Sequence, residues 1–250
     1  MTAPLEIRGV RKAFGGLQAL AGASFRLPAP GIYGLIGPNG AGKTTLFDVI
    51  TGRQRPDDGA VLIEGTDRSG TAPHALAALG VARTFQECRV FPEMTCLENM
   101  LFATRPKGLA AALAQAATRS QAHREAREPG ARRLLALARL DRCADARADV
   151  LSYGQRRLLE IAAALVTQPR LLLLDEPASG VNPALLESLR EVLLAEQRER
   201  PTTVLVIEHN MEFIMELSER IVVMHQGAVL EEGTPAQIQA SPRVIEAYLG

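Results

Sequence analysis

The sequence predicts an α/β fold in which a mainly parallel β-sheet is covered by helices. Two observations carry this prediction: short apolar runs alternate with helical patterns, and a glycine-rich stretch stands between one apolar run and the helix after it. The chain has 250 residues, of which 47% are hydrophobic and 22% are charged. This length and composition suffice for one or two domains with a sizeable core and exclude a wholly disordered chain.

The predicted strands are short, apolar or alternating in character, and bounded by turn residues. They are expected at residues 5–10, 23–27, 31–36, 60–64, 81–85, 171–176 and 202–209, and as a hairpin over 221–233 that turns at Gln226-Gly227. The first two strands are expected to pair with each other. Helices are expected after residue 45, closed by Gly52, at 154–167 and 184–198, and as a short tail at the C-terminus.

Between residues 88 and 150 the sequence turns to alanine, leucine and arginine, which predicts helices. The tripeptide Glu128-Pro129-Gly130 is expected to divide this region into two helical halves, because proline breaks a helix interior. Residues 105–147 carry ten basic side chains against four acidic ones. This surplus fits a nucleic-acid-binding arm or a solvated helical face, and the lack of interleaved aromatic residues favours the solvated face, which a charged membrane surface would also attract.

The remaining composition points to the cell interior. Twenty-eight Lys and Arg balance 28 Asp and Glu, so no overall charge favours a nucleic-acid partner. Cys88, Cys96 and Cys143 lack metal-ligand spacing and are expected as reduced thiols. The first residues form no apolar signal core and no run of 18 apolar residues occurs, so the sequence predicts a soluble intracellular protein.

A phosphate-binding loop is the strongest motif. The pattern G-x-x-x-x-G-K-[ST] is matched by a stretch made of Gly37, Pro38, Asn39, Gly40, Ala41, Gly42, Lys43, Thr44 and Thr45. The glycines let successive backbone N–H groups point at phosphate oxygens, and the following helix adds the positive end of its dipole. Lys43 supplies a positive charge for the β- and γ-phosphates, and the Thr44 hydroxyl is a candidate ligand of Mg²⁺.

Acidic and polar side chains follow three other predicted strands. Asp175 suits a ligand of Mg²⁺, and Glu176, which points to the other side, suits a general base that orients the attacking water. A purely structural pair of acids is the alternative, which the phosphate loop disfavours. His209 directly follows the apolar run VLVIE (204–208) and ends the strand expected at 202–209. Gln86 follows the strand at 81–85 with a neutral carbonyl that can hold water or Mg²⁺.

A second candidate anion site precedes the helix at 154–167. Ser152-x-x-Gln155 fits a capping box, so a plain helix start is one interpretation. That interpretation does not explain Gly154 in the first turn, where glycine weakens a helix. An exposed helix N-terminus with a serine and a glycine predicts an anion-binding surface. Because the phosphate loop already holds the phosphates, this surface is expected to serve the nucleotide of another molecule.

The segments GPNGAGKTT, LSYGQ and LLLLDEP, with Gln86 and His209, resemble in order and spacing the ATP-binding subunit of ABC transporters over essentially the whole chain. The resemblance implies a P-loop NTPase fold with a RecA-like core, an N-terminal antiparallel β region and a helical subdomain. Within this single ATPase domain, residues 1–86 and 166–250 would form the core and residues 87–165 the helical subdomain. Two subunits would close head to tail around ATP, each between one phosphate loop and the LSYGQ segment of the partner.

By the same resemblance, Glu176 would be the catalytic base and His209 would contact the γ-phosphate. Ser152, Gly154 and Gln155 would contact the partner's ATP. Gln86 would sense Mg²⁺ and face the membrane partner. Phe14 stands where the family has an aromatic residue that stacks on adenine, and an ordinary core phenylalanine is the alternative.

Two departures from the commonest family pattern are visible. Tyr153 replaces the first glycine of LSGGQ, and Asn182 replaces an acid in the loop after the base. Neither removes a group assigned to phosphate or water, so ATP hydrolysis remains the expectation.

Within the family, residues 83–100 and the segments LSYGQRR, SGVNP and VIEAYLG are similar to the ATPases of high-affinity branched-chain amino acid importers. Such importers pair two ATPase subunits with two integral-membrane permeases and a solute-binding protein. The resemblance thus implies a peripheral position at the cytoplasmic face of the cell membrane, with a related chain or a second copy as the dimer partner and no nucleic acid.

Urea or short-amide importers and the lipopolysaccharide-export ATPase are alternatives within the family. A nucleotide-gated module without transport fits less well, because the chain has one motif set and no sustained heptads. A small-molecule phosphotransferase would not need LSYGQ.

Overall fold

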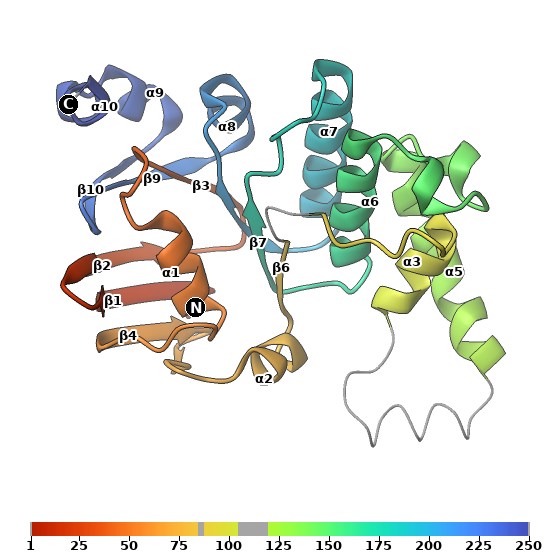
Figure 1. Ribbon diagram of the computed structural model, residues 1–250, viewed down its shortest axis with the longest axis horizontal. Helices are drawn as coiled ribbons and strands as arrows, with labels where there is room; N and C mark the ends of the chain where they lie inside the picture. Colours follow the sequence, from red (N-terminus) through yellow and green to blue (C-terminus); the bar gives the residue numbers. More distant parts are fainter. Residues whose placement is uncertain (1, 85–87, 105–119, 250) are drawn as a thin grey trace. The chain divides into compact units, whose positions relative to one another are not determined.

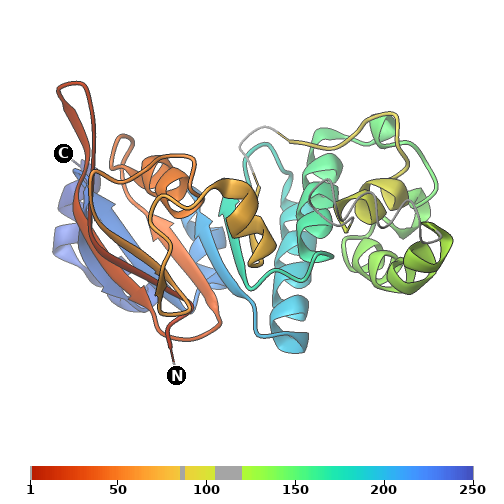
Figure 2. The same ribbon diagram turned by 90° about the horizontal axis from the view of Figure 1, so that it is seen from below.

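The computed structural model describes residues 2–84, 88–104 and 120–249 (Figures 1 and 2). The chain forms two compact units. The first consists of Met1–Arg83, Arg170–Pro177 and Pro201–Gly250, and the second of Thr84–Pro169 and Ala178–Arg200. Strands β1 to β10 all belong to the first unit, and residues 178–200 cluster with the helices of the second. In the described ranges, no helix is long and apolar enough to cross a membrane.

An antiparallel sheet of order β2-β1-β4-β5 forms one layer of the first unit. Its strands are β1 (Leu5–Phe14), β2 (Leu17–Leu27), β4 (Asp58–Ile63) and β5 (Thr66–Asp67). Strands β1 and β2 pair as the alternating pattern predicts, with Leu5 opposite Leu27. The apolar side chains of this alternation are buried, which explains why the two-residue period forms a sheet with one covered face.

A second sheet of order β10-β9-β3-β8-β7-β6 is parallel from β9 to β6, as the strand and helix alternation predicts. Its strands are β3 (Ile32–Ile36), β6 (Val81–Arg83), β7 (Leu171–Asp175), β8 (Thr203–Ile207), β9 (Arg220–His225) and β10 (Ala228–Gly233). The predicted hairpin is confirmed: β10 is antiparallel to β9, and Gln226 and Gly227 both have positive φ (47° and 78°). Positive φ at both turn residues is what a tight two-residue hairpin requires.

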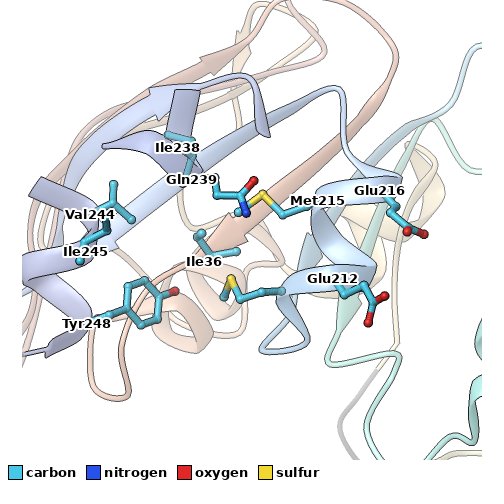
Figure 3. A pocket seen from close by; sticks show the side chains of 10 residues that line it. Ile36, Glu212, Met215, Glu216, Ile238, Gln239, Val244, Ile245 and Tyr248 are labelled. Carbon is cyan, nitrogen blue, oxygen red and sulfur yellow. The ribbon is translucent and has the colours of Figure 1, made fainter. Parts of the chain in front are cut away.

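Among the described residues, the helices of the first unit are α1 (Lys43–Ile50), α2 (Pro73–Ala78), α8 (Met211–Leu217), α9 (Pro235–Ala240) and α10 (Pro242–Leu249). Helices α8, α9 and α10 and the end of β3 enclose a largely apolar cavity of about 620 Å³ (Figure 3). Tyr248 of α10 and Ile36 of β3 line this cavity. Ile36 immediately precedes Gly37, so the C-terminal helices lie beside the start of the glycine-rich loop.

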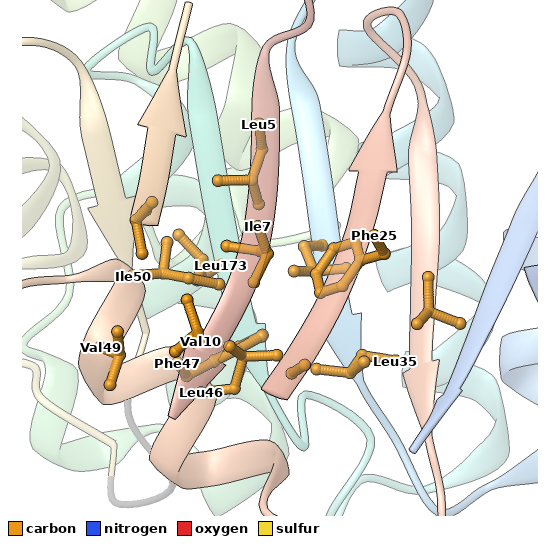
Figure 4. Close-up of a cluster of buried hydrophobic side chains, with 14 of the residues drawn as sticks. Leu5, Ile7, Val10, Phe25, Leu35, Leu46, Phe47, Val49, Ile50 and Leu173 are labelled. Atoms are coloured by element: carbon orange, nitrogen blue, oxygen red, sulfur yellow. The ribbon is translucent and has the colours of Figure 1, made fainter. Parts of the chain in front are cut away.

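The main core of the first unit lies between the two sheets and around α1 (Figure 4). Strand β1 contributes Leu5 and Ile7 to this core, α1 contributes Leu46 and Phe47, and Leu173 comes from the parallel sheet. Each such side chain contributes about 1.5–3 kcal/mol when it is fully buried. This core therefore anchors α1, and with it the glycine-rich loop, on both sheets.

The second unit is helical. It contains α3 (Cys96–Ala103), α5 (Ser120–Leu137), α6 (Tyr153–Leu165) and α7 (Pro183–Glu199), with short 3₁₀ turns η1 (Asp141–Cys143) and η2 (Ala148–Val150). Helix α3 packs against α5 and α6, and α7 packs against α5 and α6. Complete capping boxes start α3, from Thr95 and Glu98, and α6, from Ser152 and Gln155.

The predicted break at residues 128–130 is wrong, because α5 continues through Pro129. Pro129 is exposed, and one ion pair spans it, between Glu128 and Arg132 at 2.7 Å. A second pair, between Arg124 and Glu128 at 3.3 Å, lies in the turn before it. The turns after the proline pack against the other helices of this unit. Packing and flanking ion pairs therefore outweigh the cost of about 3 kcal/mol that an interior proline carries.

Several of the described arginines of this basic region are paired with acids of the same unit. Arg133 contacts both Glu196 and Glu199 of α7, and Arg139 contacts Glu191 at 3.1 Å. These contacts lie largely on the surface, which is the solvated helical face that the spacing favours.

Candidate functional site

Three parallel strands of the first unit end at one edge of the sheet. The register places Leu35 of β3 and Asp175 of β7 opposite Ile207 of β8, their common neighbour. The chain segments after these strands therefore lie together: the glycine-rich loop, Glu176 and His209. In open α/β sheets, ligands bind at this carboxyl edge.

The glycine-rich loop depends on glycine at two close approaches. A Cβ on Gly37 would lie 2.1 Å from the Met224 carbonyl oxygen, and one on Gly42 would lie 2.4 Å from the Ala19 carbonyl oxygen. Gly42 also has a left-handed φ of 97°. Any other residue at these positions would push the loop away from β9 or β2.

The β9–β10 turn holds the loop from the other side. The Gly227 N–H donates to the Ala41 carbonyl oxygen at 3.1 Å, and the Ala21 N–H donates to the Gly227 carbonyl oxygen at 2.8 Å. The turn therefore links β2 to the middle of the loop and fixes the loop backbone before any ligand binds.

Lys43 lies inside the curve of the loop. Its Nζ donates to the carbonyl oxygens of Gly37 at 2.6 Å and Pro38 at 3.0 Å. Burial lowers the pKa of Lys43, while the nearby charges of Glu176 and Asp175 oppose that shift. A buried ammonium that donates to two carbonyl oxygens is suited to an anionic ligand, which would compensate its charge more fully.

The start of α1 is open to a ligand. No side chain caps this helix in the described ranges, and its first turn holds no acid. Asn39, Gly40 and Thr44 are exposed and Thr45 is half-buried. The positive end of the helix dipole is therefore available to phosphate oxygens.

The donor set also fits Mg²⁺ bound together with a nucleotide. Thr44 and Asp175 offer hard oxygen ligands of the kind that this cation prefers. Among the described residues, no group of three or more His, Cys, Asp or Glu could hold a metal ion by itself. Mg²⁺ typically takes one or two protein ligands and fills the remaining positions with phosphate oxygens and water.

Glu176 stands on an unusual backbone. Its φ is 47°, in the left-handed region that non-glycine residues seldom adopt, and its N–H donates to the Ile207 carbonyl oxygen at 2.9 Å. Its Oε1 lies 3.3 Å from Nε2 of His209. The structure therefore brings together two side chains that the sequence analysis had singled out separately.

Glu208 and Arg83 are two further polar residues that the sequence analysis missed. The buried Glu208 carboxylate accepts the backbone N–H groups of His209 and Asn210 at 2.8 and 3.0 Å, which fixes the start of the segment that carries the imidazole. Arg83 donates to Asp175 at 2.9 Å. Two features of the sequence could have pointed to these residues: Glu208 directly precedes His209, and Arg83 is a charged residue in a short strand.

Phe14 lies at the end of β1 and is 44% exposed. The Lys12 Nζ lies 5.5 Å from its ring centroid. The core interpretation of Phe14 is therefore wrong, and the ring remains available for stacking, so its adenine role stays a prediction.

The LSYGQ residues belong to the second unit. Ser152 is exposed and Gln155 is half-buried, and their side chains complete the predicted capping box. Gly154 is buried, contrary to the exposed position expected for it: a Cβ there would lie 2.8 Å from Leu185 Cδ1 and 3.7 Å from Val181. Glycine is used here for close packing of α6 on the start of α7. Gln86 lies outside the described residues.

The comparisons with known proteins agree with this geometry. Residues 20–179 match the family model "ABC transporter", and residues 228–250 match "Branched-chain amino acid ATP-binding cassette transporter". The chain is 42% identical over 249 residues to the high-affinity branched-chain amino acid transport ATP-binding proteins BraF of Pseudomonas aeruginosa and LivG of Escherichia coli K12, covering 98% of this chain and 97% of each relative.

Solved structures show the same fold. A nucleotide-free ATP-binding cassette from an ABC transporter superposes with a TM-score of 0.84 at 32% identity, covering 100% of both chains. An ADP-bound cassette superposes with a TM-score of 0.83 at 32% identity, covering 100% of this chain and 99% of the other. The predicted P-loop NTPase fold is therefore confirmed, and the chain belongs to the ABC transporter family, as an ATP-binding subunit that hydrolyses ATP.

Proposed function

We propose that this chain is the ATP-hydrolysing subunit of an importer for branched-chain amino acids. The observation that carries the proposal is the contact between Glu176 and His209, 3.3 Å apart, beside the loop that encloses Lys43. The assignment of the solute rests on full-length similarity to BraF and LivG and on the match over residues 228–250.

In this proposal the residues of the first unit divide the work. The loop N–H groups and Lys43 bind the β- and γ-phosphates of ATP, and Phe14 stacks on the adenine. Glu176 accepts the proton of the attacking water and orients it toward the γ-phosphate, and His209 contacts that phosphate and holds the Glu176 carboxylate in place.

Thr44, Asp175 and Gln86 would hold Mg²⁺ with the nucleotide. The bound cation would neutralise negative charge on the β- and γ-phosphates. Lys43 adds positive charge on the side of the loop, so the transferring phosphoryl group would be surrounded by compensating charge.

The proposal includes an assembly. Two ATPase subunits, this chain with a related chain or a second copy, would bind two integral-membrane permeases at the cytoplasmic face of the membrane. Ser152, Gly154 and Gln155 of each would complete the ATP site of the other. A solute-binding protein would deliver the substrate from the opposite side, and nucleic acid has no part.

The proposal is tested by uptake in the cell that carries this chain. The chromosomal copy is replaced by Glu176→Gln, and uptake of labelled leucine is measured with labelled urea in a parallel culture. The matched control is Glu64→Gln, an exposed glutamate of the same unit that is paired with Arg170 at 2.8 Å.

We expect leucine uptake to be lost in the Glu176→Gln strain and to remain in the Glu64→Gln strain, with urea uptake unchanged in both. Loss of urea uptake alone would keep the ATPase role and reject the branched-chain amino acid assignment. Unchanged uptake of both solutes would reject the importer proposal.

A further inference from the structure

A buried arginine joins the two elements that carry the candidate Mg²⁺ ligands. Arg83 ends β6, beside β7, and its side chain is 7% exposed. Its Nη2 donates to Oδ2 of Asp175 at 2.9 Å, and its Nη1 donates to Oδ1 of Asp48 at 2.6 Å. Asp48 lies one turn beyond Thr44 on α1. One guanidinium therefore ties α1 to the end of β7.

The guanidinium is fixed on further sides. Its Nη1 also donates to Oγ1 of Thr51 at 3.3 Å, and its carbon lies 5.5 Å from the ring centroid of Phe47. The Asp175 side chain is 7% exposed, so this ion pair is largely removed from water. Desolvation offsets much of the attraction in such a pair, so stability alone is a weak reason for it. Its place next to the phosphate loop suggests a role in the site.

We propose that Arg83 is a positioning residue, which fixes the Asp175 carboxylate relative to α1 so that Asp175 and Thr44 can hold Mg²⁺ together with the nucleotide. This inference rests on the proposed function, in which Asp175 and Thr44 are ligands of that cation. Arginine suits the task because the two arms of its planar fork reach two carboxylates at once, which the single ammonium of lysine does not reproduce.

A positioning role and a plain charge effect of Arg83 predict opposite changes in Mg²⁺ affinity when the guanidinium is removed. The positive guanidinium repels a cation, so its removal would strengthen Mg²⁺ binding if charge alone mattered. Loss of a group that orients a metal ligand has the opposite result, and it typically weakens metal affinity by about 10- to 100-fold. The direction of the change in metal affinity therefore decides between them.

The experiment uses the full chain and two substitutions. Arg83→Met keeps an unbranched side chain that can pack on Phe47, and Arg83→Lys keeps the charge without the fork. The matched control is Arg170→Met, which removes an exposed arginine of the same unit that is paired with Glu64 at 2.8 Å. Affinity for Mn²⁺ in the presence of ADP is measured by electron paramagnetic resonance of the free ion. Binding of a fluorescent ATP analogue in EDTA and the urea midpoint are measured alongside.

We expect both Arg83 variants to bind Mn²⁺ about 10- to 100-fold more weakly and to bind the analogue in EDTA with nearly unchanged affinity. Arg170→Met should resemble the wild type in every readout. If Arg83→Met does not fold, Arg83→Lys carries the test alone. Asp48→Ala, which removes the anchor on α1 and keeps the contact to Asp175, is expected to weaken Mn²⁺ binding less.

Three results would overturn the inference: unchanged or tighter Mn²⁺ binding by Arg83→Met, full Mn²⁺ affinity in Arg83→Lys, or equal loss of Mn²⁺ and of nucleotide binding in EDTA. Asp175→Asn separates this inference from the proposed function. If Asp175→Asn leaves Mn²⁺ affinity intact, the proposed metal role of Asp175 fails. If Asp175→Asn weakens it and Arg83→Met does not, only the inference about Arg83 fails.

Discussion

The imidazole Nε2 of His209 lies 3.3 Å from Oε1 of Glu176, with 43% and 25% of the two side chains exposed. Glu176 directly follows β7, and His209 lies two residues after β8. The Glu208 carboxylate accepts a hydrogen bond from the backbone N–H of His209 at 2.8 Å. The contact is partly open to solvent. It therefore has the geometry of a working pair rather than of a buried structural pair.

Removing the imidazole should slow hydrolysis without abolishing binding. We expect His209→Gln to lower ATP turnover by about 10²-fold, because one positioned group that contacts the transferring phosphate is lost. The affinity for a fluorescent ATP analogue should change little. His74→Gln, at an exposed position on α2, is the control and should keep full turnover. Full turnover in His209→Gln would contradict the role given to His209.

The C-terminal helix should tune nucleotide affinity through Tyr248. Partial burial raises the pKa of Tyr248, and a hydrogen bond between its hydroxyl and the Gly37 backbone partly offsets that rise. Because such a bond contributes about 0.5–1.5 kcal/mol, Tyr248→Phe should weaken binding of the ATP analogue by about 2- to 10-fold.

The control for Tyr248 is Tyr33→Phe. The Tyr33 hydroxyl donates to the Ala29 carbonyl oxygen at 2.8 Å, away from the phosphate loop. This variant should lower the urea midpoint and leave nucleotide affinity unchanged. Equal nucleotide affinity in the wild type and Tyr248→Phe would exclude a link between α10 and the loop.

Two glycine substitutions should shift stability in opposite directions. Gly52 has a φ of 70°, and an added Cβ would lie 1.9 Å from the Thr71 carbonyl oxygen, so Gly52→Ala should destabilise the protein by at least about 1–3 kcal/mol. Gly130 is helical and a Cβ would meet nothing within 4 Å, so Gly130→Ala should stabilise α5 by about 0.5–1 kcal/mol. Urea unfolding measures both, and a stabilising Gly52→Ala would contradict the described turn.

Thiol reactivity should be suppressed in the folded protein. Burial raises the pKa of Cys96 and of Cys88 to about 11, so at pH 8 only about one thiol in 10³ is ionised. We expect the alkylation rate of Cys96 to rise about tenfold per pH unit between about pH 8 and 10. In the urea-unfolded protein the rate should level off near pH 9.5, since an ordinary thiol has a pKa of about 8.5. Peptide mass spectrometry after timed alkylation separates the sites, and a folded-state plateau below pH 9 would contradict the burial.

Local pattern was enough for the strands and for the phosphate loop. The alternation at β1 and β2, the apolar runs at β3, β7 and β8, and the Gln226-Gly227 turn each specify an element through a short stretch of sequence. The carboxyl-edge rule marked Glu176 and His209, which follow β7 and β8, as candidates for a ligand site. Their contact with each other was not predicted and is a finding of the structure.

Interactions between distant residues could not be read in the same way. Arg83 contacts Asp175 across 92 residues and Asp48 across 35, and nothing local to either partner predicts the pair. Gly154 was interpreted by its exposed helix start, whereas its neighbour Leu185 comes from another helix. Pro129 was interpreted by its intrinsic preference, which the packing of α5 overrides.

The most direct test of the account is Glu176→Gln in the purified full chain, with steady-state ATP turnover and binding of the ATP analogue measured on the same sample. Glutamine keeps the shape and the contact distance to His209 and cannot accept the proton of the attacking water. We expect turnover to fall by about 10²–10⁴-fold while nucleotide affinity is kept, and Glu64→Gln to match the wild type in both. Loss of a general base lowers turnover by at least about 10²-fold. Retention of more than about a tenth of the wild-type turnover would therefore remove Glu176 from the role of base and contradict the mechanism.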